Sequence, residues 1–217
     1  MRLAVLLTAL PMLLALALRA WCLQHGFGGQ QPLWRACYSD LPALLGNLRL
    51  GSATGEPVVP AAVLRALAEL TGGVDARAQT VFVLLWALVA LILLAVCTVA
   101  IGAYRPDRVL LFVLCPALAL GLLISGDLIG VALMVVGIVA WSRRHDLAAG
   151  VALGLAVLSG SLALAVVVAV IMLSRRIGRR LRRLLLAGAG TVAVVCVVAA
   201  PQGIAAVVGN APRERQL

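Results

Sequence analysis

Long apolar runs divided by short polar turns make up most of the chain. The clearest run, VFVLLWALVALILLAVCTVA at residues 81 to 100, holds no charged residue. A helix needs about 20 apolar residues to cross the ~30 Å hydrocarbon core of a bilayer. Only helices and closed barrels satisfy their backbone hydrogen bonds in lipid, and a barrel would show short alternating segments instead. The pattern therefore predicts an all-α, polytopic helical membrane protein.

Further along the chain, the apolar runs become shorter and come in pairs. At a rise of 1.5 Å per residue, such runs cover only about 21 to 24 Å, and they fit best as short hairpins. We expect about seven membrane segments in a single membrane domain over residues 1–217. The segments are a signal-anchor helix over 1–23, a crossing over 79–103, a hairpin of 109–124 and 128–141, a hairpin of 147–158 and 162–173, and a last crossing that begins at Leu184 in a bundle over 79–209. The tail 210–217 is polar.

Residues 24–78 form the one long polar segment and predict an outer loop with two amphipathic helices. The first helix follows Ser39 and Asp40, and its apolar positions have helical spacing: Leu41, Leu44, Leu45 and Leu48. In the second helix one face is predicted to hold Val59, Val63, Leu67 and Leu70, with Arg65 and Glu69 paired on the other face. We expect both helices to lie in the plane of the membrane interface.

The positions of the charged residues predict how the chain is oriented in the membrane. The chain is 64% hydrophobic, and its net charge of +10 comes from arginine alone, placed mostly in the short turns. The positive-inside rule then predicts a multi-pass protein of the plasma (inner) membrane with a cytoplasmic N-terminus. Nucleic acid is not an expected partner, because aromatic residues make up only 4% of the chain. An arginine cluster is predicted to bind the head groups of anionic lipids: Arg175, Arg176, Arg179, Arg180 and Arg183.

Two cysteines stand apart from those in the apolar runs. Cys22 and Cys37 both border or lie in the outer segment, where a disulfide would persist. The sequence is consistent both with a Cys22–Cys37 disulfide and with two free thiols.

The sequence predicts no metal site and no cofactor, since it lacks the spacings of zinc ligands, phosphate loops and dinucleotide fingerprints. The string GVALGLAVLSG is typical of close helix packing through small residues.

Asp40 and Asp127 are the acidic residues that the predicted topology makes chemically interesting. It brings the Asp40 loop, the Asp127 tip and the tip at 159–161 to the same outer face. A carboxylate at this depth is a functional candidate, and one carboxylate could act as a general base while the second orients the acceptor. Each aspartate also precedes a predicted helix, so a role as helix cap is the alternative for both.

Four strings in this order resemble the actinobacterial membrane mannosyltransferases of the GT-C class, family 87 type, which use a polyprenyl-phosphate sugar. They are RACYSDLPALL (35–45), GEPVVPAA (55–62), SGDLIGVAL (125–133) and AGVALGLAVLSGSLAL (149–164). The resemblance implies a GT-C-like fold and inverting transfer of a sugar to an envelope glycan or glycolipid acceptor. It implies that Asp40 is the catalytic base and that Asp127 is a second catalytic carboxylate.

The same resemblance implies a substrate-binding set consisting of Arg35, Tyr38, Arg49 and Glu56, in which the arginines would meet the leaving phosphate. The chain departs from the family at Gly126 and at 159–161, where the family has an aromatic residue and a lysine. It also corresponds to the front half of such an enzyme only. The alternatives are therefore a fragment or degenerate copy, or a non-catalytic integral membrane subunit that binds another membrane protein of the cell envelope.

Overall fold

All regular elements in the described part of the chain are helices. The computed structural model describes residues 7–27, 38–49, 56–160, 162–173 and 178–209. In chain order the helices are α2 (Ala9–His25), α4 (Leu41–Arg49), α5 (Val58–Leu70), α6 (Ala76–Tyr104), the short 3₁₀ helix η1 (Pro106–Arg108), α7 (Val109–Val113), α8 (Pro116–Gly121), α9 (Leu128–Ser142), α10 (Asp146–Val157), α11 (Leu162–Leu173) and α12 (Gly178–Gly209).

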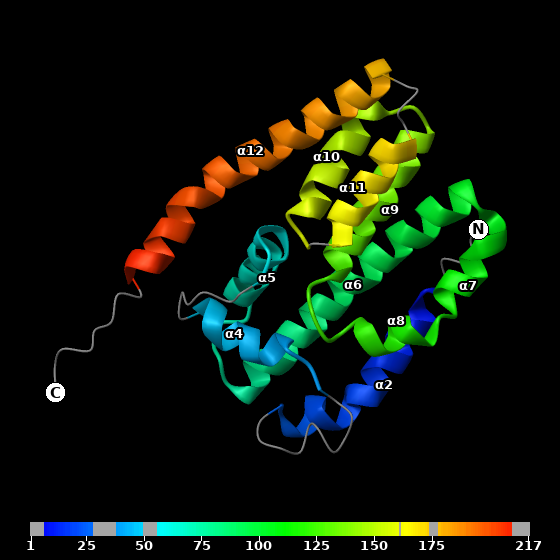
Figure 1. The fold of residues 1–217 in the computed structure, drawn as a ribbon. Coiled ribbons are helices and arrows are strands. Elements are labelled where there is room, and N and C mark those ends of the chain that lie inside the picture. Colours follow the sequence, from blue (N-terminus) through cyan, green and yellow to red (C-terminus); the bar gives the residue numbers. More distant parts are fainter. Residues whose placement is uncertain (1–6, 28–37, 50–55, 161, 174–177, 210–217) are drawn as a thin grey trace.

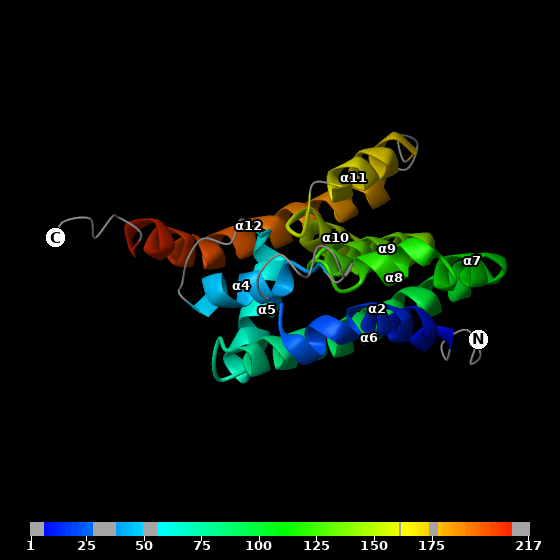
Figure 2. The ribbon, with the colours of Figure 1, turned by 90° about the horizontal axis from the view of Figure 1, so that it is seen from below.

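The long helix α6 runs through the middle of the molecule, and the others pack around it (Figure 1). α9 packs between α6 and α10, and α12 packs along α10. On another side of α6 lies α2, which also contacts α8, while α4 and α5 contact each other and α6. Seen from below, α2 and α6 form one side of the molecule and α11 and α12 the opposite side (Figure 2).

The largest hydrophobic core lies where α6 meets the helices of the outer loop. Trp86 and Phe82 of α6 are fully buried there, together with Leu41 and Leu45 of α4 and Leu64 of α5. Full burial of a large apolar side chain contributes about 1.5–3 kcal/mol, so these contacts fix α4 and α5 on α6. The outer-loop helices are therefore part of the folded body.

α6 confirms a helix over the predicted segment 79–103 and extends it by one turn at its start, while the membrane crossing itself stays a prediction. Asp75 caps the helix by accepting a hydrogen bond from the Ala78 N–H at 3.4 Å, and the helix ends before Pro106. Within the described residues, α6 and the 180–199 part of α12 are long and apolar enough to cross a membrane. The predicted number of about seven membrane segments is not confirmed, because the other apolar helices are shorter.

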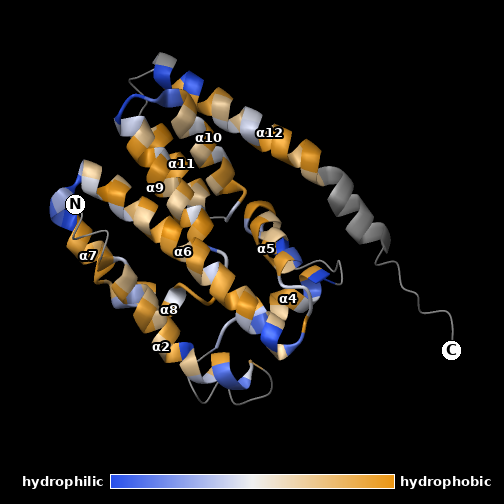
Figure 3. Cartoon of the chain, turned by 180° about the vertical axis from the view of Figure 1, so that it is seen from behind, coloured by the Kyte–Doolittle hydropathy of each residue, from blue (hydrophilic) through white to orange (hydrophobic). Residues whose placement is uncertain are grey.

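Polar and apolar residues are nevertheless arranged in bands. An apolar middle lies between two polar ends, one around the start of α12 and the α9 to α10 turn, the other around the start of α6 (Figure 3). Exposed apolar side chains are frequent in the middle band, including Leu84 and Leu88 of α6 and Val194 of α12. An exposed band of this kind suits a lipid environment better than water.

The small-residue pattern at 150–160 brings α10 and α12 into close contact, as predicted. A Cβ atom at Gly150 would lie 2.4 Å from the Leu184 carbonyl oxygen, and one at Gly154 would lie 2.8 Å from the Gly188 carbonyl oxygen. No side chain larger than hydrogen fits at either position without moving the helices. Glycine here permits the backbone approach that stabilises helix pairs in membranes.

The outer-loop helices correct part of the prediction. The buried face of α4 is the predicted one. In α5, however, the buried residues are Pro60, Leu64 and Ala68, while Leu70 is 70% exposed. No ion pair joins Arg65 to Glu69 in the described structure. Val59, Val63 and Leu67 of the predicted α5 face are partly buried against the same core, so both helices pack on the body. Their placement in the plane of the membrane interface stays a prediction.

The boundaries of two predicted segments are also wrong. The run 109–124 is divided into α7 and α8, because Pro116 lacks the N–H that a continuous helix needs. The last helix begins at Gly178 rather than Leu184 and continues past Pro201 to Gly209. Arginine has a high helix propensity, so the basic segment 179–183 extends the helix instead of preceding it.

Candidate functional site

The site is built on the chain that follows α8. A helix leaves its last four carbonyls without intrahelical partners, and α8 ends at Gly121. The Trp86 indole N–H donates to the Leu122 carbonyl at 3.0 Å. The Ser39 hydroxyl donates to the Leu123 carbonyl at 2.6 Å, and the Asp40 N–H to the Ile124 carbonyl at 3.1 Å. We call residues 120–124, with these acceptors, the carbonyl segment.

The carbonyl segment joins the Asp40 turn to the Asp127 turn. Ser39 and Asp40 donate to it directly, and Asp127 follows it by three residues. Gly126 lies against α5, where an added Cβ would be 3.1 Å from the Pro60 Cβ. The Val59 N–H in turn points to the Leu158 carbonyl at 3.5 Å, next to Ser159. The predicted convergence of the Asp40 loop, the Asp127 tip and the 159–161 tip is thus confirmed for its described residues.

Neither aspartate side chain acts as a helix cap. Asp40 precedes α4, but the Leu41 N–H donates to the Ser39 hydroxyl at 3.4 Å, and no backbone N–H donates to the Asp40 carboxylate. Asp127 occupies the N-cap position of α9 and makes no capping hydrogen bond with its side chain. The capping alternative therefore lacks the hydrogen bond that would define it.

Each aspartate instead accepts a hydrogen bond from a neighbouring hydroxyl. Tyr38 donates to Asp40, and this bond, together with the negative charge of Asp40, raises the pKa of the Tyr38 phenol. The Ser125 hydroxyl donates to Asp127 at 2.7 Å. Asp40 is half-buried and Asp127 is exposed. Both carboxylates keep lone pairs free to accept a proton or a ligand hydroxyl.

Glu56 lies close to both aspartates. Partial burial raises the pKa of its carboxyl above the ordinary value, and the charges of Asp127 and Asp40 raise it further. The structure thus brings together three of the residues that the sequence analysis selected: Asp40, Glu56 and Asp127. The three acidic residues therefore form one negatively charged region of the fold.

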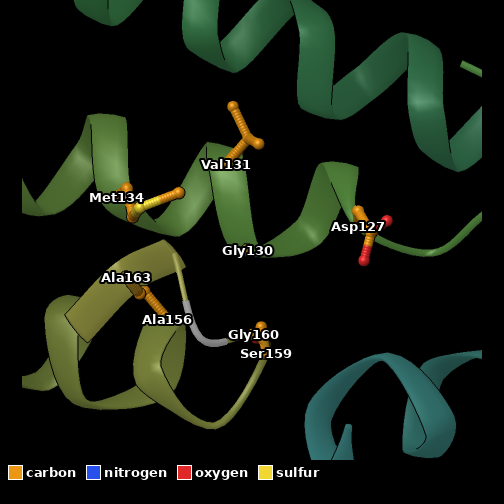
Figure 4. A pocket seen from close by; sticks show the side chains of 8 residues that line it. All are labelled: Asp127, Gly130, Val131, Met134, Ala156, Ser159, Gly160 and Ala163. Atoms are coloured by element: carbon orange, nitrogen blue, oxygen red, sulfur yellow. The ribbon is translucent and has the colours of Figure 1, made fainter. Parts of the chain in front are cut away.

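A cavity of ≈ 300 Å³ opens beside Asp127. Its walls are Gly130, Val131 and Met134 of α9 on one side and the α10 to α11 turn on the other, and Asp127 lies at one end (Figure 4). Gly130 leaves room for Ser159, whose Cβ would lie 3.1 Å from a Cβ at that position. An apolar cavity with a carboxylate at its edge is the usual form of a small-molecule site.

Arg19 was not selected by the sequence analysis, yet it borders the site. Its side chain is 3% exposed in α2, and its guanidinium donates to the Leu120 carbonyl at 2.9 Å, with a longer contact of 3.5 Å to the Tyr38 carbonyl. Its Nε atom has no partner in the described structure. The signal was present, because an arginine within an apolar run is expected to have a specific partner or function.

The predicted binding arginines have different surroundings. Arg49 donates to the Ala68 carbonyl at 2.8 Å, at the end of α5. Arg180 forms an ion pair with Asp146 at 2.8 Å and donates to the Trp141 carbonyl. Arg183 is exposed. Outside the described residues and side chains lie Arg35, Arg175, Arg176 and Arg179.

Cys22 of α2 is disulfide-bonded, and Cys37, its expected partner, lies outside the described residues. Within the described chain, no three histidine, cysteine or carboxylate side chains are grouped to hold a metal ion.

Comparisons of the chain with protein-family models, with curated proteins and with solved structures find no match.

Proposed function

We propose that this chain is a GT-C-like, lipid-linked sugar (mannosyl) transferase of the cell envelope, acting at the outer face of the plasma membrane. The observation that supports this best is the proximity of Glu56 to both Asp40 and Asp127. A cavity opens beside Asp127. The multi-pass topology and the cytoplasmic N-terminus are part of the proposal, and so is the donor, a polyprenyl-phosphate sugar.

Asp40 acts as the general base in the proposed reaction. Its carboxylate takes the proton of an acceptor hydroxyl while that oxygen bonds to the anomeric carbon of the sugar. The bond between this carbon and the phosphate oxygen breaks, and the polyprenyl phosphate leaves with the electron pair. Tyr38 holds the Asp40 carboxylate in place through its hydroxyl. Asp127, at the edge of the cavity, orients the acceptor.

Sugar transfer by the purified chain, from a polyprenyl-phosphate donor to a glycolipid acceptor, tests this proposal. Asp40→Asn removes the base and should lower the rate by about 10²–10⁴-fold. Asp107→Asn is the matched control, because Asp107 is exposed in η1, pairs with Arg108 and does not line the cavity. Undiminished transfer by the Asp40 variant would exclude this residue as the base.

A non-catalytic membrane subunit is the second candidate, and α12 is the observation that favours it. The helix packs on α10 near its start and then extends beyond the body (Figure 1), with Val194, Val197 and Val198 more than 60% exposed. Such a surface suits another membrane helix as well as lipid. A partner that copurifies at fixed stoichiometry from the native membrane, combined with no transfer activity, would favour this function over catalysis.

A further inference from the structure

A second hollow lies on α6 and α9, near the polar end opposite the carboxylates. It has a volume of ≈ 490 Å³, and apolar residues form its walls except at Arg143. Its floor includes Ala95 and Ala100 of α6, whose small side chains leave the space open. Exposed Ile92 and Val99 border it. We call this hollow the α6–α9 groove.

The length of the groove matches one leaflet of a bilayer. From Ile92 to Ala103, both lining residues, the axis of α6 rises about 16 Å. Half of a ~30 Å hydrocarbon core is about 15 Å. Because α6 is long and apolar enough to span a membrane, the groove would face the acyl chains of a single leaflet. Its shape thus suits one hydrocarbon chain lying along the helix.

Arg143 supplies a positive charge at the end of this groove. α9 ends at Ser142, and the Arg143 N–H donates to the Val139 carbonyl, so its side chain projects from the last turn beside the groove. Within the described structure the Arg143 guanidinium has no hydrogen-bond or ion-pair partner. Asp146, the nearest carboxylate in sequence, is paired with Arg180, and Asp107 is paired with Arg108.

We propose that the α6–α9 groove binds an anionic phospholipid, with one acyl chain in the groove and the phosphate on Arg143. A guanidinium matches the geometry of phosphate oxygens through paired N–H donors. The apolar walls exclude water from the acyl chain and give the site a preference over the general lipid surface. This site is separate from the arginine cluster at 175–183, and it uses none of the residues proposed for sugar transfer.

Lipid association measured by electron spin resonance tests the proposal. The full chain is reconstituted in phosphatidylcholine vesicles with spin-labelled phosphatidylglycerol or spin-labelled phosphatidylcholine, and the immobilised fraction gives their relative association constants. Arg143→Gln should reduce the preference for phosphatidylglycerol about tenfold, because it removes a direct hydrogen-bonded contact between the guanidinium and the phosphate. Arg144→Gln is the matched control. It removes the same charge from the adjacent residue, which does not line the groove, and should change the preference less than twofold.

A second experiment fills the α6–α9 groove with a large side chain. Ala100→Phe, or Ala103→Phe if the first variant fails to reconstitute, should release the immobilised phosphatidylglycerol while all arginines remain. Equal losses in the Arg143 and Arg144 variants would mean that only general surface charge attracts the lipid, and the proposal would be wrong. Unchanged immobilisation after filling, or groove occupation by a second copy of the chain detected as a cross-linked dimer through this face, would also overturn it.

The groove depends on the membrane placement of α6, which the proposed transferase shares. Extraction of native membranes with alkaline carbonate separates the two failures. A chain released by carbonate would refute both proposals together. A chain retained in the membrane that shows no preference for phosphatidylglycerol would refute the lipid site alone and leave sugar transfer standing.

Discussion

Replacing Gly150 with alanine should separate α10 from α12. A Cβ atom at this position would lie 2.4 Å from the Leu184 carbonyl oxygen and 2.7 Å from the Ala187 Cβ. The first is a backbone atom and the second has no rotamer to change, so neither moves away without a shift of the helix. The Gly188 N, at 3.1 Å, prevents a simple lateral adjustment. Relief requires the two helices to move apart along their contact.

The expected magnitude has two opposing parts. Alanine stabilises a helix interior by about 0.5–1 kcal/mol relative to glycine. Overpacking by one added methyl costs about 1–3 kcal/mol. Gly190→Ala is the matched control, because Gly190 lies in α12 and has nothing within 4 Å of an added Cβ. The free energies of unfolding of the two variants should therefore differ by about 1–3 kcal/mol, with the Gly150 variant the less stable.

Thermal unfolding of both variants in the same detergent measures this difference. For a chain of this size each kcal/mol corresponds to about 2–4 °C in Tm. A fluorophore pair on α10 and α12 would report the separation directly. If Gly150→Ala unfolded at or above the Tm of Gly190→Ala, the close approach of α10 and α12 would be wrong, and the small residues of α10 would need another explanation.

Three further predictions address the site and its support. Trp86→Phe leaves the buried Leu122 carbonyl without its donor and should destabilise the fold by about 1–3 kcal/mol, measured by denaturant titration with proteolysis at 122–127 as a local readout. Because the folded state raises the pKa of Glu56, the wild type should lose stability as pH rises above the ordinary value of 4.5, whereas Glu56→Gln should lack this loss in Tm measured across that range. Arg180→Gln leaves buried Asp146 unpaired, and a drop of about 1–3 kcal/mol in unfolding free energy is expected, recovered in the Asp146→Asn double variant.

The two outer-loop helices show when an apolar pattern predicts a buried face. In α4 the leucines alternate with polar or small residues, and the burial of Leu41, Leu45 and their neighbours follows the predicted stripe. α5 is apolar on most of its circumference, so its period does not select a face. The choice of Leu64 and Ala68 over Leu70 depends on tertiary contacts with the neighbouring helices α4 and α6, which the period of α5 does not indicate.

In the candidate site, the sequence predicted which charged residues lie together, but it did not predict the hydrogen bonds that hold them there. Orientation by arginines sufficed to predict that Asp40 and Asp127 lie at one end. The sequence indicated that Arg19 needs a partner, but not that this partner is the Leu120 carbonyl, 101 positions away. It gave no sign that the Trp86 indole donates to the Leu122 carbonyl, 36 positions away. Every residue has a backbone carbonyl, so the sequence does not indicate which carbonyl will accept a hydrogen bond from a distant side chain.

The end of α8 at Gly121 explains how a mostly apolar chain specifies one arrangement of its site. Apolar contacts in this protein are numerous and interchangeable, so they favour compact packing without selecting a single register. The end of α8 creates unpaired carbonyls in a setting where leaving them unpaired is costly. Ser39, Trp86 and Arg19 meet that need from three separate elements, and each bond has a fixed direction. The position of Asp40 relative to Asp127 is therefore set by the hydrogen-bonding demand of the carbonyl segment, more than by the leucine packing that surrounds it.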